Sequence, residues 1–166
     1  MDITPFSIAI PEAEVEDLVT RVRNTRWPDD VATDWSRGTP TSYARVLASS
    51  WADDFDWRAQ EARLNEFPQF TTQIDGQTVH FVHVRSAEPG ATPLLILHGY
   101  PSSFVESIRM IGPLGDPVAH GGRAEDAFHV VVPSLPGFGF STPVSGPGWA
   151  IRESAAAFDQ VMQALG

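Results

Sequence analysis

The spacing of apolar residues changes near residue 70 and divides the chain into two predicted regions. Before that point apolar residues recur every three or four positions, as they do along one face of a helix. They predict one helix over 11–27, a second that opens at 39–40, and a third over 57–67 with Asp56 as its cap. The expected inner positions are Val15, Leu18, Val19 and Val22 in the first helix and Tyr43, Val46, Leu47 and Trp51 in the second. We therefore predict a helical arm over residues 1–70, with its aromatic residues used for packing.

Residues 71–166 show the alternation and the short apolar runs of a β-sheet. Two extended runs around Asp75-Gly76 predict a hairpin. Leu94–Leu97 and Val130–Val132 are continuous apolar runs, typical of strands buried on both faces of a parallel sheet. Helices are expected after them, over 102–114 and 149–166. The first would open with a capping box of Ser103 and Glu106, and the second would align Ile151, Ala155, Phe158, Met162 and Leu165. This order is the opening of a mostly parallel α/β sheet.

Composition limits the function classes. A net charge of −10 without any lysine argues against nucleic-acid and anionic-membrane partners and excludes a P-loop. The absence of cysteine excludes disulfides and thiolate metal sites. The first residues lack the basic n-region of a secretory signal, so we expect none, and no apolar run reaches the roughly 18 residues of a membrane span. We expect a soluble cytoplasmic protein that needs neither metal nor cofactor.

The chemistry-bearing segment is His98-Gly99-Tyr100-Pro101, directly after the first buried strand. Ligands of open α/β sheets bind at the carboxyl ends of the strands, where this segment and residues 133–141 both lie. A cis bond before Pro101 would fold the loop back and leave the Tyr100 N–H free to stabilise a developing negative charge. A plain strand-terminating turn is an equally good interpretation of these four residues alone.

The other titratable residues favour structural roles. His80 and His83 are three apart on one predicted strand, so they face opposite sides and cannot share a metal. His129 lies inside a strand and is also expected to be structural. The acids Asp53, Asp54 and Asp56 fit a solvated helix end.

Six segments resemble, in order, the N-terminal part of microsomal-type epoxide hydrolases, which are α/β-hydrolase enzymes with an N-terminal extension. They are PFSIAIPEAEVEDLVTRV, RWPDD, SSWADDFDWRAQEARLNEFPQF, IDGQTVHFVHVRS, HGYPSS and PSLPGFGFS. Tyr100 and Ser102 stand where that family usually has tryptophan and glycine. The tyrosine is expected to keep the backbone donor, whereas Ser102 is expected to affect how the loop turns.

The resemblance implies an incomplete α/β-hydrolase sheet and a two-step reaction. An aspartate on a tight elbow attacks the epoxide to form an ester, two cap tyrosines hold the epoxide oxygen, and a histidine oriented by an acid activates water to cleave the ester. It implies that the Tyr100 N–H is an oxyanion donor and that His98, Gly99 and Pro101 shape its loop. It also places the strand 94–97 between the strand 130–132 and the elbow strand.

The elbow itself is not in this sequence. A Gly-x-Asp-x-Gly elbow needs two glycines four residues apart, and none of the 13 glycines has that spacing. We expect the nucleophile, the cap tyrosines, the acid and the histidine to lie beyond residue 166, so that the chain alone is inactive. Three readings stay open: an epoxide hydrolase gene product that is truncated or is one piece of a split enzyme; a non-catalytic binding or interaction module derived from that fold; and, least favoured, an active hydrolase with an unrecognised site. The free edge of Leu94–Leu97 is expected to recruit that piece or a second copy.

Overall fold

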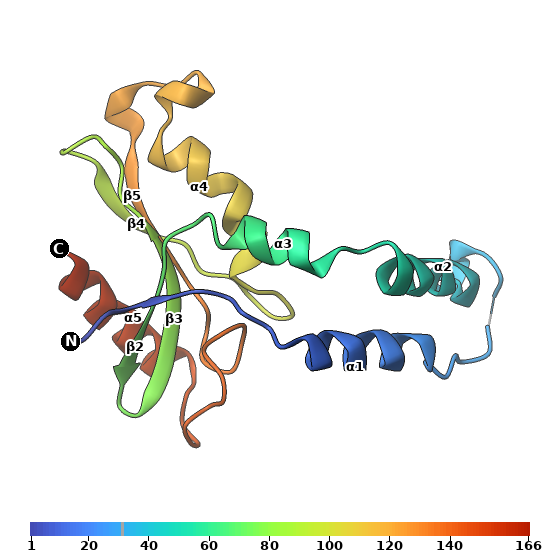
Figure 1. Cartoon of the computed structure of the whole chain (residues 1–166). Coiled ribbons are helices and arrows are strands. Elements are labelled where there is room, and N and C mark those ends of the chain that lie inside the picture. The colour runs from blue at the N-terminus through green and yellow to red at the C-terminus, as the bar shows by residue number, and fades with distance from the viewer. Residues whose placement is uncertain (31) are drawn as a thin grey trace. The chain divides into compact units, whose positions relative to one another are not determined.

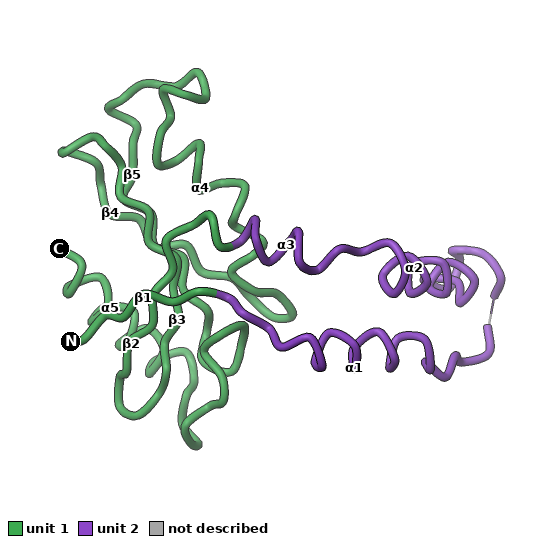
Figure 2. Tube along the Cα trace, viewed as in Figure 1, with its two compact units in different colours: residues 1–7, 65–166 green, residues 8–64 purple. Residues whose placement is uncertain are grey.

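The computed structural model describes residues 1–30 and 32–166, which form two compact units. One unit comprises residues 8–64; the other combines residues 1–7 with 65–166 (Figure 2). The sequence-based division at residue 70 differs from this at both ends. At the N-terminal end the reason is a short first strand, β1 (Thr4–Phe6), which pairs with the sheet although the sequence places it in the helical arm. Three residues are too few to show an alternating pattern. At the other end residues 65–70 group with the sheet, whose next strand begins at Gln69.

The sheet has five strands in the order β1-β2-β3-β5-β4 (Figure 1). The new members are β2 (Gln69–Ile74), β3 (Gln77–Val84), β4 (Thr92–Leu95) and β5 (Phe128–Pro133). Neighbours from β1 to β5 are antiparallel, and β4 runs parallel to β5 with Leu94 opposite Val130. The predicted hairpin and the predicted pair of parallel strands are therefore confirmed, and β4 lies at the edge of the sheet.

The hairpin turn has the backbone that its sequence demands. Asp75 and Gly76 have φ values of 50° and 77°, so both are left-handed, as a two-residue turn of the primed type requires. An Asp-Gly pair meets this requirement at little cost, because aspartate tolerates the conformation and glycine has no Cβ.

β4 differs from its prediction in extent and burial. It spans residues 92–95 rather than 94–97, and the bond from the Ile96 N–H to the Val131 carbonyl (2.9 Å) continues the ladder by one residue. Leu94–Ile96 are half-buried and Leu97 is 49% exposed. The apolar run is therefore covered less than the sequence predicts; among the described residues β5 is the strand that pairs with it, on one side.

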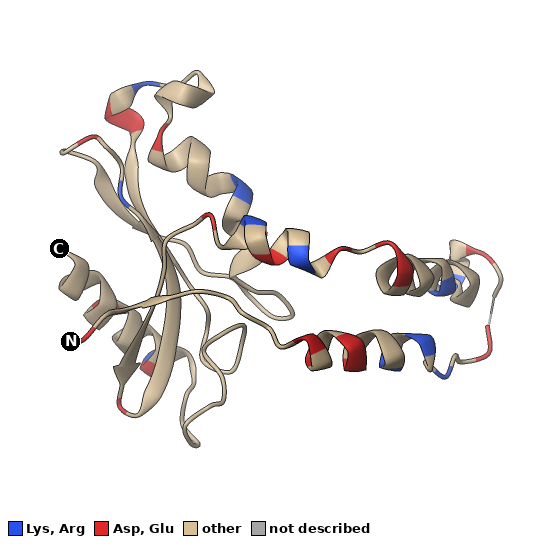
Figure 3. Cartoon of the chain, in the orientation of Figure 1, with Lys and Arg blue, Asp and Glu red and all other residues tan. Residues whose placement is uncertain are grey.

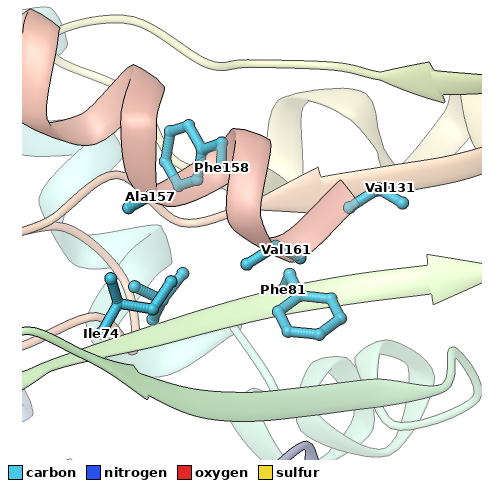
Figure 4. Close-up of a cluster of buried hydrophobic side chains, with 7 residues drawn as sticks. Ile74, Phe81, Val131, Ala157, Phe158 and Val161 are labelled. Carbon is cyan, nitrogen blue, oxygen red and sulfur yellow. The ribbon is translucent and has the colours of Figure 1, made fainter. Parts of the chain in front are cut away.

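The helices α4 (Ile108–Gly115) and α5 (Ile151–Leu165) pack on opposite faces of the sheet. Phe158 and Val161 of α5 pack onto Phe81 and Val131 (Figure 4). His80, the neighbour of Phe81 on β3, points to the other face, where it meets Phe104 before α4. The sheet thus separates two cores, as in an α/β protein.

The predicted face of α5 is confirmed in part: Phe158 is buried and Met162 and Leu165 pack against the same core, but the first turn of the helix differs. Ala157, Phe158 and Val161 are buried, whereas Ile151 is 89% exposed and Ala155 is exposed. Burial begins one turn into the helix, at Ser154, so the apolar residue at its start has no sheet beneath it.

The helix before α4 begins differently from its prediction. Phe104–Ser107 form a 3₁₀ turn, and Ser103 Oγ accepts the Val105 N–H at 3.4 Å. The carboxylate of Glu106 accepts a hydrogen bond from the Ser102 hydroxyl. The expected capping box between Ser103 and Glu106 is therefore wrong, because the competing Ser102 hydroxyl takes the carboxylate.

The unit of residues 8–64 contains the three expected helices, α1 (Glu12–Arg23), α2 (Thr41–Asp53) and α3 (Trp57–Leu64). In α1 the acids lie toward the start and the arginines toward the end (Figure 3). Asp56 Oδ1 accepts the Ala59 N–H at 2.9 Å, which confirms the predicted cap. The expected inner side chains of α2, however, are 44% to 64% exposed: Tyr43, Val46, Leu47 and Trp51. Tyr43 meets the Trp35 ring at 5.0 Å and Trp51 lines a cleft with α1, so the described part of this unit covers these side chains only in part.

Candidate functional site

The His98–Pro101 segment follows β4, as the sequence predicted. The Tyr100-Pro101 bond is cis, and the Ser102 N–H donates to the Gly99 carbonyl at 2.9 Å to close the turn. His98 is buried, whereas the Tyr100 side chain is 87% exposed. The tip of the turn is therefore open, and its base is held by the imidazole.

His98 joins this loop to the loop that follows β5. Its Nε2 accepts the Leu135 N–H at 3.0 Å. Because a backbone N–H can only donate, the ring proton is on Nδ1, which lies 3.2 Å from the Gly99 carbonyl oxygen. The structure thus brings together the two strand-end segments that the sequence singled out separately, and His98 is the link.

Phe138 covers the same imidazole from the loop after β5. Its ring lies edge-to-face with His98 at 5.5 Å and with Tyr100 at 6.4 Å. The Phe138 N–H donates to the Leu135 carbonyl at 2.9 Å, which closes the turn that carries the ring. The loop after β5 therefore both anchors and covers the loop after β4.

The Tyr100 N–H donates to no acceptor in the described residues. The side chain of the same residue contacts only the Phe138 ring among the aromatic groups described. A backbone donor at the carboxyl end of a strand is the feature that can bind a developing oxyanion.

A buried polar network beneath these loops was not foreseen from the sequence. His80 Nδ1 lies 2.9 Å from Ser134 Oγ, and its Nε2 lies 3.0 Å from Gln69 Oε1. Burial lowers the pKa of His80 from its ordinary value of about 6.5 to about 4, so the ring is neutral near pH 7. The structural role expected for His80 is thereby given specific partners. Alternation along β3 predicts which face the residue takes but not its partners, which are distant in sequence.

The remaining titratable candidates have structural contacts. His83 contacts Phe70, and burial, Arg85 and His129 lower its pKa. His129 Nδ1 accepts the Ser86 N–H at 3.0 Å. Asp53 pairs with Arg23 at 2.7 Å, as expected of a solvated helix end. Among residues 1–30 and 32–166 no group of three or more His, Asp or Glu side chains is placed to hold a metal; that the chain needs none stays a prediction.

An apolar cleft of about 430 Å³ lies elsewhere, within the unit of residues 8–64. Its walls are the apolar faces of α1 and α2 with Trp57, and Glu14 is the titratable side chain on them. The lining holds that single carboxylate and no hydroxyl, imidazole or second acid to act with it, so the cleft is not equipped for catalysis.

Comparison with known proteins assigns the family. Residues 3–107 match the model described as "Epoxide hydrolase N terminus", and residues 92–166 match the "alpha/beta hydrolase fold" model. The chain belongs to the epoxide hydrolase family. The two matches together span the arm, the sheet and the loop after β4, which confirms the resemblance read from the sequence.

Epoxide hydrolases from several organisms resemble the chain along its whole length. A Stigmatella aurantiaca protein that carries a provisional epoxide hydrolase name is 48% identical over 99% of this chain, and epoxide hydrolase 1 of Oryctolagus cuniculus is 37% identical over 99%. The solved Aspergillus niger epoxide hydrolase superposes over 100% of this chain with a TM-score of 0.80 at 36% identity. The juvenile hormone epoxide hydrolase of Bombyx mori gives 0.85 at 31%, over 99%.

The chain spans well under half of these epoxide hydrolases. It covers 38% of the Stigmatella aurantiaca protein and 37% of the Oryctolagus cuniculus protein, and 44% and 39% of the two solved chains. It aligns with their N-terminal parts, as the "Epoxide hydrolase N terminus" match indicates.

No helix among the described residues is long and apolar enough to cross a bilayer.

Proposed function

We propose that this chain supplies the oxyanion-loop part of an epoxide hydrolase, an enzyme that converts an epoxide and water to a vicinal diol through a covalent aspartyl ester. The observation that carries the proposal is the Tyr100 N–H, which has no acceptor in the described residues and sits on a turn anchored by His98 at the end of β4. Family membership supports the reaction class.

The donor would act in the second step. Water attacks the carbonyl carbon of the aspartyl ester and its proton passes to the histidine base; the carbonyl electrons move onto oxygen, where the Tyr100 N–H stabilises the negative charge. Collapse of this intermediate expels the diol oxygen, which takes up a proton, and restores the carboxylate. In this proposal another segment brings the nucleophile, the base and the cap tyrosines, because no Gly-x-Asp-x-Gly elbow occurs in this sequence.

The first test concerns the chain by itself. We predict no diol from styrene oxide above a heat-killed control, because an oxyanion donor without a nucleophile supplies about a hundredfold to a thousandfold at most. Mixing the chain with the complementary C-terminal part of the Stigmatella aurantiaca relative is expected to restore turnover. Turnover by the chain alone would show that a nucleophile has been overlooked.

The second test isolates the backbone donor in the complemented enzyme. Replacing residue 100 by the α-hydroxy acid analogue of tyrosine turns its N–H into an ester oxygen and leaves the side chain in place. We expect hydrolysis of the aspartyl ester to slow by about a hundredfold to a thousandfold, so that the ester accumulates. Tyr100→Phe, the matched control, keeps the N–H and is expected to change the rate little. An ester variant as fast as the control would remove Tyr100 from the mechanism.

A non-catalytic binding module is the second candidate, and the exposed edge of β4 favours it. It predicts a stable complex with a partner strand but no turnover even when the complementary segment is present.

A cytoplasmic location also belongs to the proposal; fractionation of the source cells would test it.

A further inference from the structure

One fully buried histidine has no part in the chemistry outlined for Tyr100. His80 is 0% exposed, and its ring lies among Phe6, Phe104 and Phe140 with centroid distances of 5.0, 5.0 and 5.2 Å. A phenylalanine would satisfy such an aromatic enclosure as well as a histidine does. The polar contacts of the ring must therefore explain why an imidazole is placed there.

Both ring nitrogens of His80 are used, and the partners fix the tautomer. The Gln69 side-chain oxygen accepts at 3.0 Å, which puts the ring proton on Nε2. Nδ1 then accepts the hydroxyl proton of Ser134 at 2.9 Å. The orientation of the Ser134 hydroxyl thus depends on a neutral imidazole supported from β2.

The backbone around His80 holds the same serine. The Ser134 N–H donates to the His80 carbonyl at 2.8 Å. Ser141 connects the two residues again: its hydroxyl oxygen accepts the His80 N–H at 2.9 Å and its hydroxyl donates to the Ser134 carbonyl at 2.8 Å. Ser134 is 0% exposed, so each of these bonds lies away from water.

Ser134 is the residue directly before Leu135, whose N–H holds His98 at 3.0 Å. Fixing Ser134 on both its side chain and its backbone fixes the peptide that presents this N–H. His98 in turn contacts the Gly99 carbonyl, which closes the turn of Tyr100. The contacts run without a gap from His80 through Ser134, Leu135 and His98 to the turn.

We propose that His80 is a positioning residue for the oxyanion loop: by holding Ser134 it orients the Leu135 N–H, and thereby His98 and the Tyr100 turn. The catalytic importance of His80 rests on the proposed function. The effect of His80 on the geometry of the loop does not. The proposal can therefore be tested on the 166-residue chain without an activity assay.

The test compares His80→Phe with Thr72→Val at neutral pH. His80→Phe keeps an aromatic ring in the enclosure but cannot bond Ser134. Thr72→Val, the matched control, removes one part-buried side-chain bond of β2, to the Asp2 carbonyl at 2.8 Å, far from the loop in sequence. Nitrogen NMR of the His98 ring is expected to show mixed tautomers in the first protein and the parent tautomer in the second. The Tyr100 amide signal is expected to shift only in the first.

Amide exchange gives a second readout and also works in associated samples. Loss of one neutral hydrogen bond predicts exchange of the Leu135 amide at least about fivefold faster in His80→Phe, with little change in Thr72→Val. Ser134→Ala removes the other partner and should give the same increase. The effects of the double variant should be non-additive if both act through one bond.

His80→Gln provides a conservative rescue, because an amide can donate to Gln69 and accept from Ser134. We expect it to recover most of the parent His98 signature. An unchanged His98 tautomer and Leu135 exchange in a folded His80→Phe, or additive effects of the two substitutions, would overturn the proposal. If His80→Phe does not fold, the Ser134→Ala readout decides alone. Failure of the Tyr100 ester experiment, by contrast, would count against the proposed function and leave these contacts standing.

Discussion

Single residues carry different constraints at two of the positive-φ glycines of the sheet-containing unit. Gly76 and Gly139 both have positive φ, 77° and 50°. A Cβ on Gly76 would meet nothing within 4 Å, whereas a Cβ on Gly139 would lie 2.6 Å from Ser134 Oγ and 3.3 Å from its Cβ. Since Ser134 is held by His80 on both sides, it cannot yield without breaking buried hydrogen bonds. Gly139, in the loop after β5, thus belongs to the same set of contacts as His80 and Ser134.

We therefore predict that Gly139→Ala destabilises the protein more than Gly76→Ala. The backbone cost of a left-handed alanine is about 1–2 kcal/mol at either site, and the clash at residue 139 adds about 1–3 kcal/mol. Urea unfolding of the two variants measures the difference. Equal losses of unfolding free energy would mean that Ser134 moves freely.

The buried imidazole of His80 predicts a pH dependence. Its pKa is lowered from about 6.5 to about 4 on folding, so between these values the unfolded chain binds a proton that the folded chain does not. The unfolding free energy should therefore rise with pH across this window, and acidification should remove up to about 3 kcal/mol.

Unfolding of the parent and of His80→Gln at a series of pH values checks this dependence. The glutamine cannot titrate, so its curve should be flatter between about pH 4 and 6.5. His83, whose pKa burial also lowers, adds a smaller slope of the same sign to both proteins. Parallel curves for the two proteins would show that His80 does not titrate in this window.

At the scale of elements, the features that the sequence predicts depend on adjacent residues. The features that it does not predict depend on contacts between residues far apart in sequence. Asp75-Gly76 and the His98–Pro101 segment carry their signals in adjacent residues, so the hairpin and the loop after β4 were correctly predicted. The bond from Leu135 to His98 joins residues 37 apart, and that from His80 to Ser134 joins residues 54 apart. No local pattern contains such pairs. The exposed start of α5 at Ile151 has the same origin, because the sheet beneath the helix decides where burial begins.

The helical unit yields an element-scale prediction. No residue of α1, α2 or α3 is fully buried, and short helices without a packed face are marginal in water. Residues 8–64 expressed alone should give a weak helical circular-dichroism signal that melts gradually. Under the same conditions the 166-residue chain should melt more sharply, since its sheet has a core. A cooperative transition for the isolated unit would show that it folds independently.

At the scale of the whole molecule, the sheet order leaves its two end strands, β1 and β4, paired on one side only, and β4 is the one that leads into the His98–Pro101 loop. β4 bonds to β5 on one side and lies at the end of the sheet. The Ile96 N–H points to β5, so by alternation those of Leu95 and Leu97 point outward. Unpaired backbone groups beside apolar side chains are a template for another strand. The loop proposed to bind the oxyanion starts directly after this edge, so a strand added there would lie next to the Tyr100 turn.

We predict that the 166-residue chain associates through this edge. Light scattering across a dilution series should show a mass that rises with concentration. Leu97→Lys places a charge at the edge on a side chain that is already 49% exposed, so it should weaken association, raising the dissociation constant at least about tenfold. Leu18→Lys, at a 40% exposed position on α1, is the matched control and should leave association unchanged. If Leu18→Lys weakens association more, the apolar helices rather than β4 form the contact. A concentration-independent monomer with slow amide exchange at Leu95 and Leu97 would mean that the edge is protected within the chain.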